Sequence, residues 1–171
     1  MPQRYIDTTL FDLFKVGPGP SSSHTIGPMK AGHHFAENCA ALPRDLLVRA
    51  VRFRVRLYGS LSATGTGHGT DAAVVAGLLG TAPESCPAGL LQELMDDPHT
   101  RRKRSLGDGQ VSVCVDDVSH DAIIHDFPYS NTLVADLLDA EDNVLHSQEY
   151  YSVGGGFIQW KGWEPPSLGE P

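Results

Sequence analysis

The sequence predicts a single α+β domain in which helices pack on one face of a mostly antiparallel sheet. The segment 51–57 alternates apolar and charged side chains, which is the period of a half-buried strand. Four later segments are short, rich in strand-forming residues and separated by turn residues. Two apolar segments, 26–41 and 71–79, have helical composition and follow loops rich in glycine and hydroxyl side chains. A chain of 171 residues with 40% hydrophobic side chains is long enough to form one such core.

The first part of the chain is expected to consist of two helical segments joined by a loop. Residues 9–16 form a short helical segment, which the glycine and proline residues at 17–20 end. The helix 26–41 carries Pro28 in its first turn, where the missing N–H costs little, and Pro43 stops it.

The strand 51–57 is the clearest element in the sequence. Its apolar residues are Val51, Phe53, Val55 and Leu57, and its charged residues are Arg52, Arg54 and Arg56. One face of this strand is therefore apolar and the other is cationic. The arginines are either solvated or face acidic neighbours, and the pattern leaves both readings open.

Two further helices and a connector follow this strand. The alanine-rich segment 71–79 is expected to be a helix that Gly80 ends, and 87–95 a shorter one. Residues 98–109 have the composition of a charged, irregular connector. Its four cations at 101–104 are expected to form a solvated loop rather than a nucleic-acid patch.

The second half of the sheet is predicted from four segments. They are residues 111–115, 122–125, 132–139 and 144–151, of which 132–139 would also suit a helix because of its leucines. The three glycines at 154–156 indicate a sharp backbone feature. Residues 160–171 hold three prolines and two tryptophans, and are expected to be a linker or truncated tail after a domain of residues 1–159.

Charge and composition exclude several classes of function. The net charge of −8 would repel the phosphates of a nucleic acid. No apolar run approaches the ~20 residues of a membrane span, and residues 1–5 lack the apolar core of a signal peptide, so a cytoplasmic protein is expected. Cys39, Cys86 and Cys114 are odd in number and far apart, which predicts free buried thiols and no metal ligand set in this chain.

Two loops carry the candidate functional residues. The run Gly19-Pro20-Ser21-Ser22-Ser23-His24-Thr25 packs four hydroxyls and one imidazole directly before the helix 26–41. Hydroxyl donors at a helix N-terminus can hold a carboxylate, and the adjacent histidine can move a proton on the bound molecule. The run Gly65-Thr66-Gly67-His68-Gly69-Thr70-Asp71 repeats this arrangement before the next helix. Together the loops indicate a site for a small anionic metabolite.

Four segments resemble the bacterial iron–sulfur-dependent L-serine dehydratases, and the resemblance covers nearly the whole chain. They are residues 11–15, 19–32, 58–71 and 150–157. The resemblance is to the N-terminal beta domain, which is a separate subunit in some members and is fused to an alpha domain in others. Its fold resembles the allosteric substrate-binding domain of some D-3-phosphoglycerate dehydrogenases.

This resemblance implies a lyase that converts L-serine to pyruvate and ammonia. The [4Fe-4S] cluster would be held by the alpha domain or subunit rather than by this chain, which alone would be inactive. Family members are often dimers, which implies a homodimer as well as the alpha-domain partner.

The resemblance also assigns catalytic roles to the histidines of the two loops, His24 and His68. We expect His68 to remove the α-proton and His24 to be a second acid–base group or an orienting group, with the reverse assignment open. The residues expected to hold the substrate carboxylate or to order its loop are Ser21, Ser22, Ser23 and Thr25. The opposite wall of the site is expected to consist of Ser60, Ser62, Thr64 and Gly65. His33 and His34, in mid-helix, are expected to be surface groups.

A second candidate site lies in the last third of the chain. Family members regulated by serine carry a His-x-Asn-like pair there, and the corresponding stretch here is residues 128–131. Asn131 is kept, but Tyr129 stands at the position of the histidine. We therefore expect weak or absent binding of an effector serine at Tyr129 and Asn131.

A stand-alone serine-binding regulatory module is the alternative interpretation of the whole chain. The likeness of the fold to allosteric domains supports it. The pair His24 and His68 discriminates between the two, because a pure sensor has no need of two histidines at one anion site. The enzyme part is therefore the favoured hypothesis.

Overall fold

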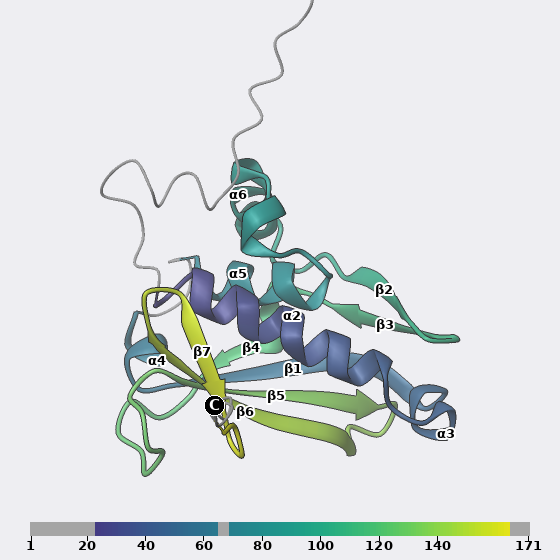
Figure 1. The fold of residues 1–171 in the computed structure, drawn as a ribbon. Coiled ribbons are helices and arrows are strands. Elements are labelled where there is room, and N and C mark those ends of the chain that lie inside the picture. Colours follow the sequence, from purple (N-terminus) through teal and green to yellow (C-terminus); the bar gives the residue numbers. More distant parts are fainter. Residues whose placement is uncertain (1–22, 65–68, 165–171) are drawn as a thin grey trace, which may run out of the picture.

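A seven-stranded sheet is the centre of the computed structural model, which describes residues 23–64 and 69–164 (Figure 1). Its strands are β1 (Ala50–Tyr58), β2 (Arg102–Leu106), β3 (Gly109–Val113), β4 (Val118–His120), β5 (Thr132–Asp139), β6 (Val144–Gly154) and β7 (Phe157–Trp160). The order is β2-β3-β1-β5-β6-β7, and β4 pairs with β1 off this path. Only the pairs of β1 with β3 and with β4 are parallel among these strands. The mostly antiparallel sheet is confirmed.

Helices cover one face of this sheet (Figure 1). The helix α2 (Ile26–Ala40) packs along α5 (Thr70–Leu78), and α6 (Ala88–Asp96) contacts α5. The shorter segments are α3 (Arg44–Leu47), α4 (Ser60–Ala63), η1 (Pro83–Ser85) and η2 (Val115–Asp117). The predicted α+β architecture with helices on one side is confirmed. None of the helices in these ranges has the length and apolar character needed to cross a membrane.

The core lies between the helices and the apolar face of β1. Phe53, Val55 and Leu57 alternate along this strand and are buried in one cluster with Phe35 of α2. The rings of Phe35 and Phe53 meet edge to face, with centroids 6.0 Å apart. All nine residues of α5 are buried, so this helix has no polar face toward solvent. The three cysteines are buried and free, as predicted.

The arginines of β1 face acidic neighbours on the side of the sheet opposite the core. Arg54 donates two hydrogen bonds to Asp136 Oδ2, at 3.0 and 2.7 Å, and Arg56 donates a third at 3.2 Å. Asp136 lies on β5 directly across from Arg54 and is only 1% exposed. Ser147 of β6 donates to its other oxygen at 2.7 Å. Cross-strand pairing therefore decides between the two readings of the arginine pattern.

The connector predicted at 98–109 is wrong, because residues 102–106 form the edge strand β2. Arg102 and Arg104 are half-buried there and pair with Glu93 and Glu37, each at 3.1 Å. Arg104 also donates to the carbonyl of Leu78 at 2.8 Å. The cations therefore belong to an edge strand tied to the helices rather than to a solvated loop. Charged edge strands resemble loops in composition because they expose one whole side.

Two further strands differ from the prediction. Residues 122–125 do not form a strand: Ile123 and Ile124 are 60% and 91% exposed, and β4 lies earlier, at 118–120. The sequence does not predict β7. Its last residue, Trp160, begins the expected tail but pairs with Tyr150 of β6. The helical segment expected at 9–16 lies outside the described residues.

The position of His34 also differs from the expectation of a surface group. Its ring is half-buried and stacks on that of Trp160, with centroids 4.3 Å apart. Its Nδ1 forms a hydrogen bond with the hydroxyl of Tyr150 at 2.7 Å. Burial lowers the pKa of His34, and the neighbouring His33 lowers it further. The missed strand β7 thus supplies the partner that covers this side of α2.

Candidate active site

The imidazole of His24 lies between two serine side chains at the start of α2. The Oγ of Ser23 is 3.0 Å from Nδ1 of the ring. On the other side, Nε2 is 3.2 Å from the carbonyl oxygen of Ser60 and 3.1 Å from its Oγ. The structure therefore brings together three of the predicted residues from two segments 36 positions apart.

These contacts favour one tautomer of the neutral ring. A backbone carbonyl can only accept a hydrogen bond, so the contact with the Ser60 carbonyl assigns the proton to Nε2. Nδ1 then carries the lone pair and accepts from the Ser23 hydroxyl. Proton uptake by His24 would accordingly take place at Nδ1, on the side of the ring where Ser23 lies.

A glycine makes the turn that brings Ser60 to this ring. Gly59, between β1 and α4, has a φ of 61°, in the left-handed region that L side chains rarely adopt. A Cβ there would also lie 1.9 Å from the carbonyl oxygen of Ser130. Glycine alone fits both conditions. Its presence at position 59 lets the backbone turn directly from β1 into α4, with Ser60 as the first residue of the helix.

Two hydroxyls that the sequence analysis did not assign hold the backbone of the His24 loop. Thr70, the first residue of α5, donates from Oγ1 to the carbonyl oxygen of His24 at 2.6 Å. Ser152 of β6 donates from Oγ to the carbonyl oxygen of Ser23 at 2.7 Å. Thr70 lies in the motif segment 58–71 and Ser152 in the segment 150–157. The spacing of these motifs does not predict which backbone groups the two hydroxyls contact.

The hydroxyls of Ser62 and Thr64 donate to backbone carbonyls other than that of His24. Ser62 donates to the carbonyl of Asp121 at 2.6 Å, and Thr64 donates to that of Leu61 at 3.1 Å. Thr25 is 1% exposed, and its Oγ1 has no hydrogen-bond partner among the described residues. The remaining predicted residues, Ser21, Ser22, Gly65 and His68, lie outside the described residues.

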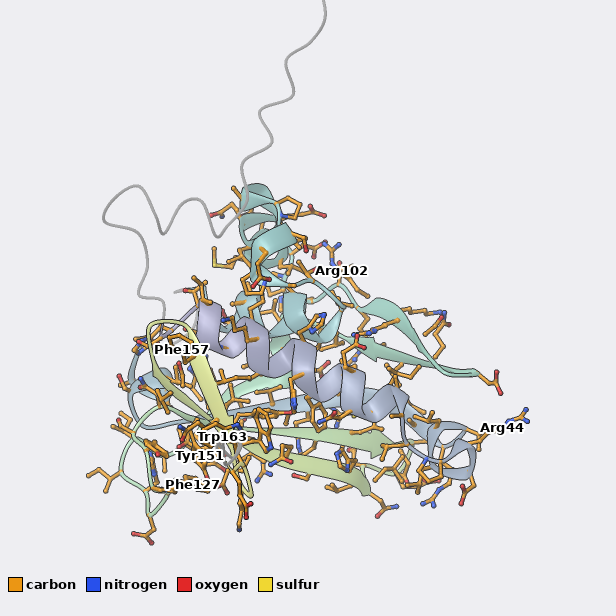
Figure 2. All side chains as sticks on the ribbon, in the orientation of Figure 1. Arg44, Arg102, Phe127, Tyr151, Phe157 and Trp163 are labelled. Atoms are coloured by element: carbon orange, nitrogen blue, oxygen red, sulfur yellow. The ribbon has the colours of Figure 1, made fainter. Side chains whose placement is uncertain are left out.

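The candidate effector residues lie near a groove of about 720 Å³. It is lined by His125, Asp126, Phe127, Pro128, Glu149, Tyr151 and Lys161, and Figure 2 shows Phe127 and Tyr151 on the same side of the molecule. Tyr129 contacts this groove through the ring of Tyr151, with centroids 4.9 Å apart, and donates to Gln159 at 3.1 Å. The Oδ1 of Asn131 is buried without a partner in the part of the chain that is described.

The chemistry of the groove is set by the pair formed by Tyr151 and Glu149. The hydroxyl of Tyr151 donates to the Glu149 carboxylate. Burial raises the pKa of Tyr151, and its hydrogen bond to Glu149 raises it further. Tyr151 is therefore a neutral donor at physiological pH. The groove offers an aromatic wall with two acidic groups, Asp126 and Glu149, and the basic Lys161.

The described residues do not supply ligands for a metal ion or cluster. No three side chains of His, Cys, Asp or Glu gather suitably within residues 23–64 and 69–164. The thiols of Cys39, Cys86 and Cys114 are buried, and burial raises the pKa of each, which opposes the thiolate form that iron requires. An iron–sulfur cluster therefore does not fit this part of the chain.

Comparison with known proteins gives one consistent family. The family described as "Serine dehydratase beta chain" matches residues 9–163. "L-serine dehydratase 2" of Escherichia coli is 40% identical over 156 residues, and "L-serine dehydratase" of Streptomyces coelicolor is 40% identical over 155. "L-serine dehydratase" of Haemophilus influenzae is 37% identical over 153. Each alignment covers 88% of this chain but 33% of the relative, so the chain spans about a third of the length of these relatives.

The family match includes every described residue around His24, namely Ser23, Ser60, Thr70 and Ser152. Because it extends over most of the sequence and the relatives share more than a third of their aligned residues, the chain belongs to the serine dehydratase beta chain family.

Proposed function

We propose that this chain is the beta part of an L-serine dehydratase and contributes half of an active site that deaminates L-serine to pyruvate and ammonia. The observation that carries the proposal is the ring of His24, held between Ser23 and Ser60 in a chain whose relatives are L-serine dehydratases. The other half of the site belongs to a cluster-bearing alpha part, as a second domain or subunit. The [4Fe-4S] cluster there supplies Lewis-acid chemistry when bound.

The role of His24 follows from its hydrogen bonds. Deamination requires that a base remove the α-proton of serine and that a proton reach the departing hydroxyl. His24 can accept or return a proton at Nδ1, through the hydroxyl of Ser23 that contacts it. We assign His24 as the second acid–base or orienting group and His68 as the base that removes the α-proton.

The N-terminus of α2 is the proposed site for the substrate carboxylate. Ser23 and Thr25 lie at this end of a 15-residue helix, whose first N–H groups and dipole favour an anion. Neither the side chain of Thr25 nor any acidic residue caps the first turn. The preceding hydroxyls of Ser21 and Ser22 would add donors to the same carboxylate, and Ser62, Thr64 and Gly65 would shape the opposite wall.

The proposal extends to assembly and regulation. We propose a homodimer of the complete enzyme, with serine binding weakly or not at all as an effector at Tyr129 and Asn131. The hydroxyl of Tyr129 is already engaged with Gln159, and a phenol cannot take the charge of an imidazole near neutral pH. A saturable second serine site that Asn131→Ala removes, measured by titration calorimetry, would contradict this part of the proposal.

Anaerobic formation of pyruvate from L-serine tests the main proposal. We would compare the chain alone, a cluster-bearing alpha part alone and the two mixed. Activity is expected only in the mixture, and His24→Ala should lower kcat about 100-fold or more, the usual contribution of an acid–base group. His99→Ala is the matched control, because the side chain of His99 is 82% exposed, and it should leave the rate unchanged.

An inactive mixture whose cluster is spectroscopically intact would contradict the proposal. Two explanations would then remain. The chain would be a serine-binding regulatory module that binds serine in the groove beside Tyr129, or the enzyme would act on a substrate other than serine. Binding of L-serine to the chain alone, followed by calorimetry, would separate these two outcomes.

A further inference from the structure

Ser152 connects the sheet to the loop that carries His24. It lies near the end of β6 and is 6% exposed. Its side chain donates to the carbonyl oxygen of Ser23 at 2.7 Å, across 129 positions of sequence. Its backbone N–H donates to the carbonyl oxygen of Asn131 at 2.9 Å. The side chain and the N–H of one buried residue are thus both committed, which fixes the place of its hydroxyl.

The beginning of α2 depends on such external contacts because its own capping residue does not hold it. Thr25 is at the N-cap but forms no side-chain capping bond, and its φ and ψ of −129° and −61° are not those of a usual cap. The carbonyls of Ser23 and His24 are instead held by hydroxyls from the sheet and from α5, Ser152 and Thr70. Two elements distant in sequence therefore set the path of the chain through the site.

The carbonyl that Ser152 holds belongs to the residue whose side chain contacts the imidazole. Ser23 accepts from Ser152 through its backbone and meets Nδ1 of His24 through its Oγ. If the backbone of Ser23 shifts, its hydroxyl moves away from Nδ1 of His24. In the assigned tautomer, Nδ1 is the ring nitrogen that can take up a proton. The contact of Nε2 with Ser60 would not compensate, because it lies on the other side of the ring.

We propose that Ser152 is a positioning residue for His24, acting through Ser23. The expected effect on kcat rests on the proposed function. The expected effect on the position of the His24 ring concerns this chain alone. The hydroxyl of Ser152 contacts no reacting atom. It holds the acid–base group in the geometry in which the proton can move, and a misplacement of about 1 Å can cost as much as 100-fold in rate.

The test compares Ser152→Ala with a matched change on the same strand. Ser147→Ala removes a hydroxyl that also donates at 2.7 Å, but to Asp136, in the Arg54 and Arg56 cluster away from His24. In the complete enzyme, Ser152→Ala is expected to lower kcat about 10- to 100-fold with a smaller change in KM. Ser147→Ala should leave kcat within about twofold of wild type, and Ser152→Thr, which keeps the hydroxyl, should restore most of the activity.

A second readout uses this chain without its partner. The ¹⁵N chemical shifts of the His24 ring report the tautomer and the hydrogen bond at Nδ1. Ser152→Ala should change these shifts, and Ser147→Ala should leave them unchanged. Unfolding in urea identifies any variant that fails to fold, in which case Ser152→Thr and Ser152→Cys are compared instead.

Two results would overturn the inference. One is a folded Ser152→Ala variant with the His24 ring signals of wild type. The other is a loss of activity that Ser147→Ala reproduces, which would show a general effect of weakening β6. An inactive wild-type mixture would contradict the proposed function, whereas the ring signals would still decide whether Ser152 positions His24.

Discussion

At the scale of single residues, Asp136 is a buried carboxylate that depends on several donors. Asp136 accepts hydrogen bonds from three side chains, those of Arg54, Arg56 and Ser147. A carboxylate that is 1% exposed is stable only when such donors replace its water shell. The arginines remain about a third exposed, so solvent weakens the pairing, but the carboxylate itself has no access to water.

Replacement of Asp136 by asparagine should therefore destabilise the fold. The change keeps the shape but leaves two arginines without their anion, and we expect a loss of about 2–3 kcal/mol in the free energy of unfolding, measured in urea. Asp142→Asn is the matched control, because the Asp142 side chain is 63% exposed and pairs with Arg52, itself partly exposed. It should cost less than about 1 kcal/mol. Equal losses in the two variants would contradict the importance of burial at Asp136.

At the scale of elements, the contact between α2 and α5 sets the geometry of the site. Thr70, the first residue of α5, donates to the carbonyl oxygen of His24, just before α2, at 2.6 Å. Further along, the two backbones touch at Gly77, where an added Cβ would lie 2.1 Å from the carbonyl oxygen of Met29 and 2.8 Å from the N of His33. This approach keeps the beginnings of α2 and α5 side by side.

Gly77→Ala should force these helices apart. Alanine favours a helix by about 1 kcal/mol over glycine, but here the clash with backbone atoms should dominate and lower the free energy of unfolding by about 1–3 kcal/mol. Gly89→Ala in α6 is the control, because nothing lies within 4 Å of an added Cβ there. That change should be neutral or slightly stabilising. A Gly77→Ala protein as stable as wild type in thermal unfolding would show that the helices can separate without cost.

At the scale of the whole molecule, the buried acids of the core link stability to alkaline pH. Burial raises the pKa of Cys39 from 9.0 to about 12, although Arg104 opposes the shift. Tyr150, in the same region of the core, has its pKa raised by burial and by the charge of Cys39. Both groups are therefore protonated in the folded protein at a pH where the unfolded chain loses their protons.

The free energy of unfolding should consequently fall as pH rises above 9. Below that value Cys39 is protonated in both states, so it adds no pH dependence. Between pH 9 and about 12 only the unfolded chain releases the proton, and each pH unit should cost up to about 1.4 kcal/mol from this group. Urea unfolding at pH 8, 9 and 10 measures the slope. Cys39→Ala should flatten it, and identical slopes in the two proteins would refute the link.

The sequence determined the elements whose residues are patterned by their own neighbours. The alternation at 51–57, the apolar helices 26–41 and 71–79, and the strands 132–139 and 144–151 all appear close to their predicted bounds. The hydroxyl and glycine motifs likewise predicted the family to which the chain belongs, and three of their candidate residues, His24, Ser23 and Ser60, lie together in the fold. These signals are local, because periodicity and motif spacing depend on a few consecutive residues.

Contacts between groups distant in sequence depend on how the segments pair and pack. The charged residues 102–106 become a strand because they pair with β3, and 157–160 because they pair with β6. The hydroxyls of Thr70 and Ser152 reach the His24 loop from 46 and 129 positions away. Sheet register and helix packing set such contacts, and these depend on pairing between segments rather than on the composition of either one. The sequence therefore predicts candidate residues for the chemistry, whereas the contacts that hold the His24 loop in place depend on the fold.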